Sequence, residues 1–374
     1  MKLIILKEKL KKGINIVERV SQKSLTLPIL QNTLLKTDKN FLKLSTTNLE
    51  SGINWQGLAK IEKEGQICIP TKFLSNLLNF LPDKPITLEL KDFTLSLRCE
   101  NYTTKIKGIN PEEFPIIPQL KDGQVVRVDN LGFCHALSQI INIPSVSTAR
   151  PEISGIYFVF ESNLIKMVAT DSFRLAEKKI FIDTKISKKH SLILPQSAAK
   201  EIVSVFGEKQ GDLKICFSPN QILFEYMMDE TDHPDIQFIS KLIGGEYPNY
   251  EEIIPKKYKT QVQIERKELL NQIKSASLFS GKINEVKLRI SPKNNKIEVL
   301  SQSPDLGEYK SFFTGDIKGD DLSISFNHRF LIDGISEIKK DELSFELTDE
   351  DGPAALSPLG DKDYLYIIMP IKAT

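Results

Sequence analysis

The stretch ICIPTKFLSNLLNFL, residues 67–81, decides the fold because its pattern returns twice further along the chain. An apolar run that ends in proline indicates a strand, and the residues after it have the spacing of an amphipathic helix. The expected core face of this helix contains Phe73, Leu74, Leu77, Leu78 and Leu81. LILPQSAAKEIVSVF (192–206) and ISFNHRFLIDGI (324–335) repeat the order, with Ala199, Ile202, Val203 and Phe206 on the core face of the second copy.

Each copy also has an earlier segment of helical period: KLKKGINIVERV (9–20), LGFCHALSQII (131–141) and KELLNQIKSASLF (267–279). A hairpin follows each second helix. It is clearest in ITLELKDFTLSLR (86–98), where we expect Lys91 and Asp92 to form a two-residue turn. Three copies of helix, strands, helix and strands predict an α+β chain, in which two helices of each copy cover one face of an antiparallel sheet.

Two similar segments separate the copies: GINPEEFPIIP (108–118) and GGEYPNYEEIIP (244–255). Proline-rich runs of this kind make poor helices and poor central strands, so we interpret them as linkers. The expected domains are residues 1–120, 128–248 and 256–374, each of ordinary domain size.

The composition excludes several classes of protein. Lys and Arg total 50 against 49 acidic residues in 374, a net charge of +1, which lacks the overall basic excess of a simple phosphate-binding protein. The cysteines are scattered without a CxxC pair, which indicates reduced, buried thiols and no metal site. No apolar run approaches the length of a membrane span or of a signal-peptide core. We therefore expect a soluble, cytoplasmic protein.

The usual enzyme motifs are missing. The sequence has no P-loop, dinucleotide-binding, nucleophile-elbow or HExxH motif, and its four histidines are far apart. The acidic run Asp349-Glu350-Asp351 lacks the alternating spacing of a calcium loop, and we expect it at the tip of the third hairpin. We expect neither a cofactor nor catalysis.

TDSFRLA (170–176) is the one stretch that looks like part of an active site. Ser172 has no histidine nearby, and Asp171 has no partner carboxylate. The counterpart in the first copy, TTNLESG (46–52), has neither the aspartate nor the arginine, so the turn is interpreted as a unit of the repeat. A binding surface is favoured. The alternative is an enzyme that uses Asp171, Arg174 and the acidic hairpin.

Five motifs, in order along the chain, resemble the bacterial beta sliding clamp family, the processivity subunit of DNA polymerase III: TLPIL (26–30), TDSFRLA, KLIGGEYPNYEEIIP (241–255), FNHRFL (326–331) and YIIMPIK (366–372). The resemblance implies a head-to-tail homodimer that closes into a ring of six domains around double-stranded DNA, helices inward. It also implies as partners a clamp loader, replicative and translesion DNA polymerases, and repair proteins that carry short Gln/Leu/Phe peptides.

The resemblance implies DNA contacts at Lys23, Ser24, Lys72, Ser147, Arg150, Pro151 and Glu152. Ser24 stands where the family often has a basic residue. Pro151-Glu152 replaces an aromatic pair of some members, so the resemblance does not imply stacking there. Basic residues on the helices suit a channel that attracts phosphates without reading bases. They are Lys7, Lys9, Lys11, Lys12, Arg19, Lys72, Lys200, Lys267, Lys274, Arg329, Lys339 and Lys340.

The resemblance places TDSFRLA in a pocket for partner peptides, with cationic rims at Arg174 and Lys372. The pocket would contain Ile153, Thr170, Ser172, Arg174, Leu175, Pro248, Ile253, Asp351, Pro353, Ile367, Met369, Pro370, Ile371 and Lys372. Ser172 and Phe173 replace a commoner Gly and His or Tyr, and Glu252 replaces an Arg of some members. We expect Arg174 to contact the peptide as well as the turn, with little effect of its removal on melting temperature.

Overall fold

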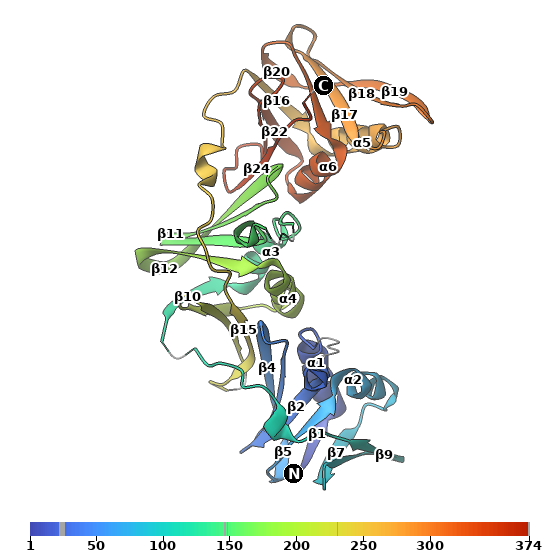
Figure 1. The fold of residues 1–374 in the computed structure, drawn as a ribbon, viewed down its shortest axis with the longest axis vertical. Coiled ribbons are helices and arrows are strands. Elements are labelled where there is room, and N and C mark those ends of the chain that lie inside the picture. Colours follow the sequence, from blue (N-terminus) through green and yellow to red (C-terminus); the bar gives the residue numbers. More distant parts are fainter. Residues whose placement is uncertain (22–26, 121, 146, 148, 230, 373–374) are drawn as a thin grey trace. The chain divides into compact units, whose positions relative to one another are not determined.

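The computed structural model describes residues 1–21, 27–120, 122–145, 147, 149–229 and 231–372, without the side chains of residues 184 and 185. These residues form two compact units (Figure 1). Unit 1 comprises Met1–His135, Ile182–Ile186 and Ser197–Ile243, and unit 2 comprises Ala136–Phe181, Ser187–Gln196 and Gly244–Thr374.

The longer helices lie where the repeated pattern predicts them. They are α1 (Lys7–Val17), α2 (Thr71–Phe80), α3 (Asn130–Ser138), α4 (Gln196–Phe206), α5 (Arg266–Ser277) and α6 (His328–Glu337). The second helix of each copy follows a strand directly, as the three quoted motifs indicate. No helix of the described residues is long and apolar enough to cross a membrane.

Unit 1 contains two sheets, and the larger one joins strands of the first and second copies. The smaller has the order β5 (Lys60–Lys63), β1 (Lys2–Leu6), β7 (Pro85–Lys91), β8 (Thr94–Cys99), β9 (Tyr102–Lys107). The larger has the order β10 (Gln124–Asp129), β13 (Asp212–Phe217), β14 (Gln221–Met227), β15 (Pro234–Lys241), β4 (Ser51–Leu58), β3 (Phe41–Thr47), β2 (Asn32–Asp38), β6 (Gln66–Pro70). The antiparallel pair of β15 and β4 connects the two copies.

Unit 2 repeats this plan with the second and third copies. Its larger sheet has the order β11 (Gly155–Thr170), β12 (Arg174–Pro195), β24 (Tyr364–Ile368), β23 (Ala354–Pro358), β22 (Glu342–Leu347), β16 (Thr260–Glu265), β20 (Asp316–Gly319). Its smaller sheet has the order β19 (Gly307–Thr314), β18 (Lys296–Ser303), β17 (Glu285–Ser291), β21 (Leu322–Asn327). Here β12 and β24 form the antiparallel pair between copies.

In each unit, a glycine of one helix lies directly against an aromatic side chain of a strand. A Cβ on Gly13 of α1 would lie 2.4 Å from the Trp55 ring, and one on Gly334 of α6 would lie 2.5 Å from the Tyr366 ring. Side chains at these positions would push the helices away from the sheet, so the glycines fix how closely the helices pack.

Two local predictions are wrong. Phe73 is 52% exposed, because the buried side of α2 is formed by Thr71, Leu74, Ser75 and Leu78. The hairpin of β7 and β8 turns at Asp92 and Phe93, both left-handed (φ 46° and 57°), whereas Lys91 pairs with Thr94. The predicted turn was one residue too early because the sequence has no Gly or Asn to mark it.

Candidate partner-peptide site

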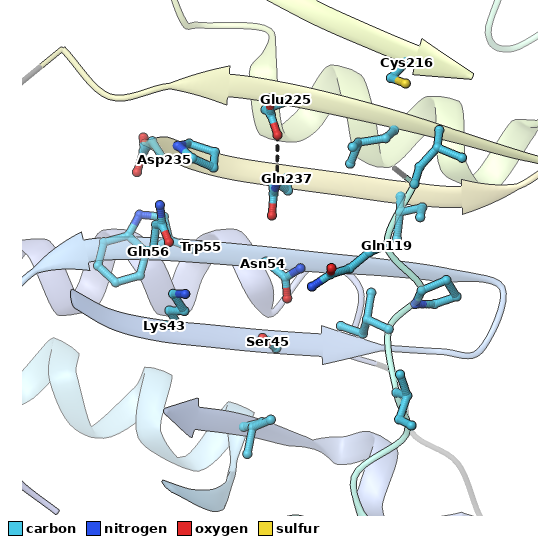
Figure 2. Close-up of a pocket in the computed structure, with 18 of the residues that line it drawn as sticks. Lys43, Ser45, Asn54, Trp55, Gln56, Gln119, Cys216, Glu225, Asp235 and Gln237 are labelled. Carbon is cyan, nitrogen blue, oxygen red and sulfur yellow. Dashed lines mark hydrogen bonds between the residues drawn. The ribbon is translucent and has the colours of Figure 1, made fainter. Parts of the chain in front are cut away.

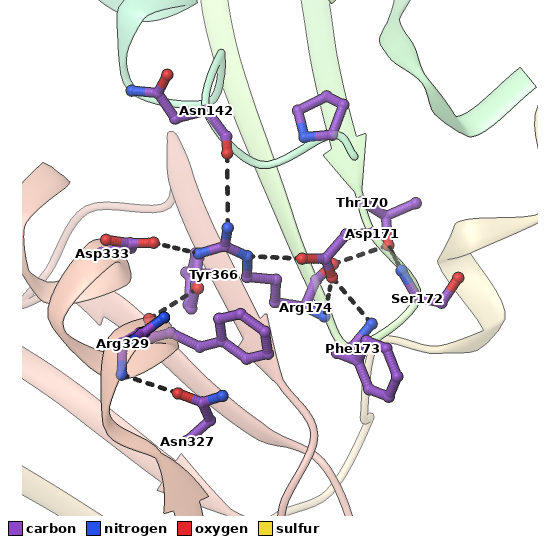
Figure 3. Close-up of polar contacts among 12 residues, drawn as sticks. Asn142, Thr170, Asp171, Ser172, Phe173, Arg174, Asn327, Arg329, Asp333 and Tyr366 are labelled. Atoms are coloured by element: carbon purple, nitrogen blue, oxygen red, sulfur yellow. Dashed lines mark hydrogen bonds and ion pairs between the residues drawn. The ribbon is translucent and has the colours of Figure 1, made fainter. Parts of the chain in front are cut away.

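The turn between β11 and β12 is shaped by the side chains of Thr170 and Asp171 (Figure 3). The hydroxyl of Thr170 donates to the Arg174 carbonyl at 2.7 Å and accepts from the Ser172 N–H at 3.1 Å. One oxygen of Asp171 accepts the N–H groups of Phe173 and Arg174, both at 3.0 Å. Asp171 is therefore held in the turn as a structural side chain.

The side chain of Arg174 leaves this turn and reaches α6 (Figure 3). Its Nε donates to Asp171 at 2.9 Å, and its Nη1 pairs with Asp333 of α6. The guanidinium carbon lies 4.5 Å from the centre of the Phe330 ring, also on α6. The side chain is only 9% exposed. Arg174, expected at a cationic rim of the pocket, thus presents little of its side chain at the surface and pairs with carboxylates instead.

The charge of Arg174 is stabilised despite its burial. Burial alone acts to lower the pKa of Arg174, but Tyr366 and Asp333 outweigh this effect, and the pKa is raised. The guanidinium is charged throughout the physiological pH range, so its ion pairs are permanent.

Behind the turn lies an apolar cluster that brings together Val168, Leu175, Tyr250, Ala355 and Ile367. The second linker covers it with its aromatic residues: Tyr247 stacks on Tyr157 at 4.5 Å between ring centres. The carboxylate of Glu177 accepts a hydrogen bond of 2.7 Å from the hydroxyl of Tyr250. The linker is thus a packed strap on the cluster, in which Pro248 is half-buried and Ile253 is exposed.

The C-terminal segment is fixed on two sides. The Met369 N–H donates to the Phe173 carbonyl at 2.9 Å, and the Ile371 N–H donates to the Ser325 carbonyl at 2.8 Å. Met369, Pro370 and Ile371 are half-buried, and Lys372 is exposed. The segment therefore adds apolar surface beside the turn without being enclosed itself.

The residues predicted to form the pocket differ in their burial and in the elements that carry them. Leu175 and Ile367 share the cluster. Ile153, just before β11, and Thr170, the last residue of β11, are also buried. Ile253 leaves 46% of its surface exposed. Asp351 and Pro353 lie at the β22–β23 hairpin, where the acidic run forms the tip as predicted. What remains open is an aliphatic surface with a polarizable Met369, suited to apolar side chains of a peptide.

The first copy contains the same turn, as predicted. The Thr47 hydroxyl donates to the Ser51 carbonyl at 2.8 Å, and Asn48 Oδ1 accepts the N–H groups of Glu50 and Ser51 at 3.0 and 2.7 Å. The third turn residue is left-handed in both copies: Leu49 at φ 74° and Ser172 at φ 78°. By these contacts Asn48 corresponds to Asp171, and Ser51 to Arg174.

A hollow of about 650 Å³ lies under the first linker in unit 1 (Figure 2). Glu225 in its wall accepts hydrogen bonds from Gln237 at 2.7 Å and Lys214 at 2.9 Å. Cys216 also lines it, but burial raises the pKa of this thiol. The hollow therefore offers no activated nucleophile.

The α6 contacts of Arg174 were not predicted from the sequence. Asp333 lies 159 residues from Arg174, and Phe330 lies on the same distant helix. No sequence motif around Asp333 or Phe330 indicates that these residues contact the turn. The fold brings both α6 and the TDSFRLA turn next to β24, and nothing in the sequence near either segment indicates this.

Of the predicted DNA contacts, Lys72 lies in unit 1, and Ser147, Arg150, Pro151 and Glu152 lie in unit 2. Lys23 and Ser24 lie outside the described residues. Lys72 is exposed on α2. Pro151 begins the short turn Pro151–Ile153, and the Ser147 hydroxyl accepts the Arg150 N–H at 3.1 Å. The Arg150 side chain lies 3.5 Å from Glu152 and 3.3 Å from the Ser172 hydroxyl.

Most of the predicted basic side chains are at least partly exposed, with one clear exception. Lys7 is buried and pairs with Asp83. The prediction that Lys7 belongs to an open basic surface is therefore wrong. Lys12 is exposed and lies 3.9 Å from Asp235. Lys200, Lys267, Lys274, Arg329, Lys339 and Lys340 are exposed.

Three family descriptions match successive parts of the chain: the N-terminal domain of the DNA polymerase III beta subunit over residues 1–118, its central domain over 132–249 and its C-terminal domain over 251–372. The beta sliding clamp of Staphylococcus aureus is 26% identical over 357 residues, 93% of each chain. The Bacillus subtilis sliding clamp structure has a TM-score of 0.95 at 24% identity, and the Pseudomonas aeruginosa clamp bound to griselimycin has 0.93 at 21%; both cover 100% of both chains.

The fold and these matches define a non-catalytic DNA polymerase processivity clamp, built from repeated α+β domains. The chain belongs to the DNA polymerase III beta subunit family. A head-to-tail dimer ring is typical of this family. Family membership excludes the alternative of an enzyme using Asp171, Arg174 and the acidic hairpin.

Proposed function

We propose that two copies of this chain close head to tail into a ring of six domains (1–120, 128–248 and 256–374 of each copy) around double-stranded DNA in the bacterial cytoplasm, associated with the nucleoid during replication. Within the described residues, β9 and β19 have one unpaired edge each. Tyr102 on β9 and Phe312 on β19 are 52% and 62% exposed. Strand edges with exposed aromatic side chains support pairing with a second copy.

In this proposal the ring holds DNA by enclosing it. A near-neutral chain can do so, because topology replaces a strong grip on phosphates. The contacts at Lys23, Ser24, Lys72, Ser147, Arg150, Pro151 and Glu152 belong to the proposal, together with the exposed lysines of the helices.

The surface at the β11–β12 turn would receive short peptides of partner proteins, by which the clamp tethers its polymerases. The observation that carries this assignment is the buried cluster of Leu175, Tyr250 and Ile367 next to exposed apolar surface at Ile253, whose N–H donates to the Tyr250 carbonyl at 3.1 Å. Two buried apolar anchors of a peptide would contribute roughly 3–6 kcal/mol before ordering costs. Such binding is weak and exchangeable, which suits successive use by a clamp loader, replicative and translesion polymerases and repair proteins.

A titration with a labelled peptide containing Gln, Leu and Phe tests the pocket. Ile253→Ala and deletion of residues 369–374 should weaken binding strongly, while the dimer persists in sedimentation. Ile116→Ala is the matched control, since Ile116 has the same place in the first linker and is 93% exposed. If the Ile253→Ala protein, the truncated protein and the control bind the peptide equally well, this surface is not the peptide site.

A further inference from the structure

The turn of residues 170–174 does not need its arginine. Thr47 and Asn48 build the same turn in the first copy, with the same left-handed third residue. Ser51 stands there in place of Arg174, and its hydroxyl bonds within the turn, 3.2 Å from Asn48 Oδ1. The arginine therefore serves something outside the turn.

The strand pairing next to the two turns is also the same. Ser51 pairs with Ser240, and Arg174 pairs with Ile368. The Lys241 N–H donates to the Glu50 carbonyl at 2.9 Å, as the Met369 N–H does to that of Phe173. Backbone geometry thus gives no reason for an arginine in one copy only.

What distinguishes Arg174 is its set of contacts with α6. Its guanidinium joins Asp171, 10% exposed, to Asp333, 55% exposed, and lies over the Phe330 ring. Phe173 stacks on the same ring at 6.5 Å between centres. A nearly buried cation held between two carboxylates resists displacement, because any movement would leave a charge unpaired.

We propose that Arg174 and Asp333 are a positioning pair: Asp333 of α6, which is not itself among the proposed pocket residues, holds the Arg174 side chain and so fixes the pocket wall at Leu175. This proposal rests on the proposed function of the β11–β12 surface. It deepens that function by making peptide affinity depend on a carboxylate outside the binding surface.

The chain of contacts is short. Asp333 holds Arg174, whose backbone lies between the Thr170 hydroxyl and Ile368. Leu175 follows directly and packs in the cluster with Ile367. Loss of the ion pair leaves the shape of the turn unchanged but removes its link to α6, and a wall that is no longer tied to the helix binds a peptide less well.

The test measures the dissociation constant of the labelled Gln-Leu-Phe peptide together with the melting temperature. Asp333→Asn should weaken binding about tenfold, and Asp333→Glu should restore most of it. Asp316→Asn is the control, since Asp316 is similarly exposed (58%) and lies 4.0 Å from Lys318, away from the turn in sequence. The control should bind as the unchanged protein does.

A double-mutant cycle separates positioning from general destabilisation. Arg174→Gln with Asp333→Asn should bind no more weakly than Arg174→Gln alone, because either change removes the same pair. Additive losses would overturn the proposal, as would unchanged affinity in Asp333→Asn while Leu175→Ala binds weakly. Unchanged affinity in both Asp333→Asn and Leu175→Ala would overturn the proposed pocket itself.

Discussion

The hydroxyl of Tyr250 donates a hydrogen bond of 2.7 Å to the carboxylate of Glu177, and both side chains are buried. This bond fastens the second linker to β12 beside the apolar cluster. Lys179 lies 2.8 Å from the same carboxylate and partly balances its charge.

Tyr250→Phe should lower the free energy of unfolding by about 1–3 kcal/mol, because Glu177 then loses a partner in a buried site. Peptide affinity should fall as well, since the strap carries Ile253. Calorimetry with Tyr226→Phe as control measures the first effect, because the Tyr226 hydroxyl donates to the Gln210 carbonyl in an exposed site. A variant as stable as the control would show that the bond contributes nothing.

Arg174→Ala should reduce stability by about 2 kcal/mol in addition to weakening peptide binding, because it removes a nearly buried ion-pair partner of Asp171 and Asp333. This replaces the expectation from sequence of an unchanged melting temperature. Ser51→Ala, at the corresponding position of the first copy, should change the melting temperature little. Equal melting temperatures of both variants would contradict the role of the network.

Gly13→Ala should destabilise unit 1 by roughly 1–3 kcal/mol through overpacking, since its Cβ would lie 2.4 Å from the Trp55 ring. Gly281→Ala is the control, because no atom lies within 4 Å of a Cβ at that position. Thermal unfolding followed by Trp fluorescence reports directly on the affected contact. If the Gly13→Ala protein and the control have the same melting temperature, α1 is not closely packed on Trp55.

Alkaline pH should destabilise unit 2 through its buried tyrosines. Burial, and then Glu346, raise the pKa of Tyr258 to about 12, and burial raises that of Tyr247, Tyr250, Tyr364 and Tyr366. The folded state thus binds these protons more tightly than the unfolded state, whose tyrosines titrate near about 10. Stability should be complete below pH about 10 and fall as the pH rises toward about 12. Circular dichroism and tyrosinate absorbance against pH measure this; a fall that begins at neutral pH would contradict it.

The sequence was sufficient for the order and the type of the elements. The three strand–helix motifs predict α2, α4 and α6, and the repeated Asx turn is visible in TTNLESG and TDSFRLA. These features depend on neighbours within a few positions, which periodicity and turn chemistry report.

The ion-pair partners of charged side chains could not be predicted from the sequence. Lys7 was placed on an open basic face but pairs with Asp83, 76 residues away. Arg174 was placed at a rim but pairs with Asp333. In both cases a distant element supplies the carboxylate, and local spacing carries no information on which elements the fold brings together.

Retention on circular DNA tests the central claim, enclosure of the duplex, most directly. The protein is loaded onto closed circular DNA by its clamp loader, washed at rising salt concentration, and compared with the same DNA cut once. The ring predicts retention on the closed circle at high salt and loss after the cut, whereas binding to short linear duplex should be weak and fall steeply with salt. Removal from closed and cut DNA at the same salt concentration would show that the chain does not encircle DNA.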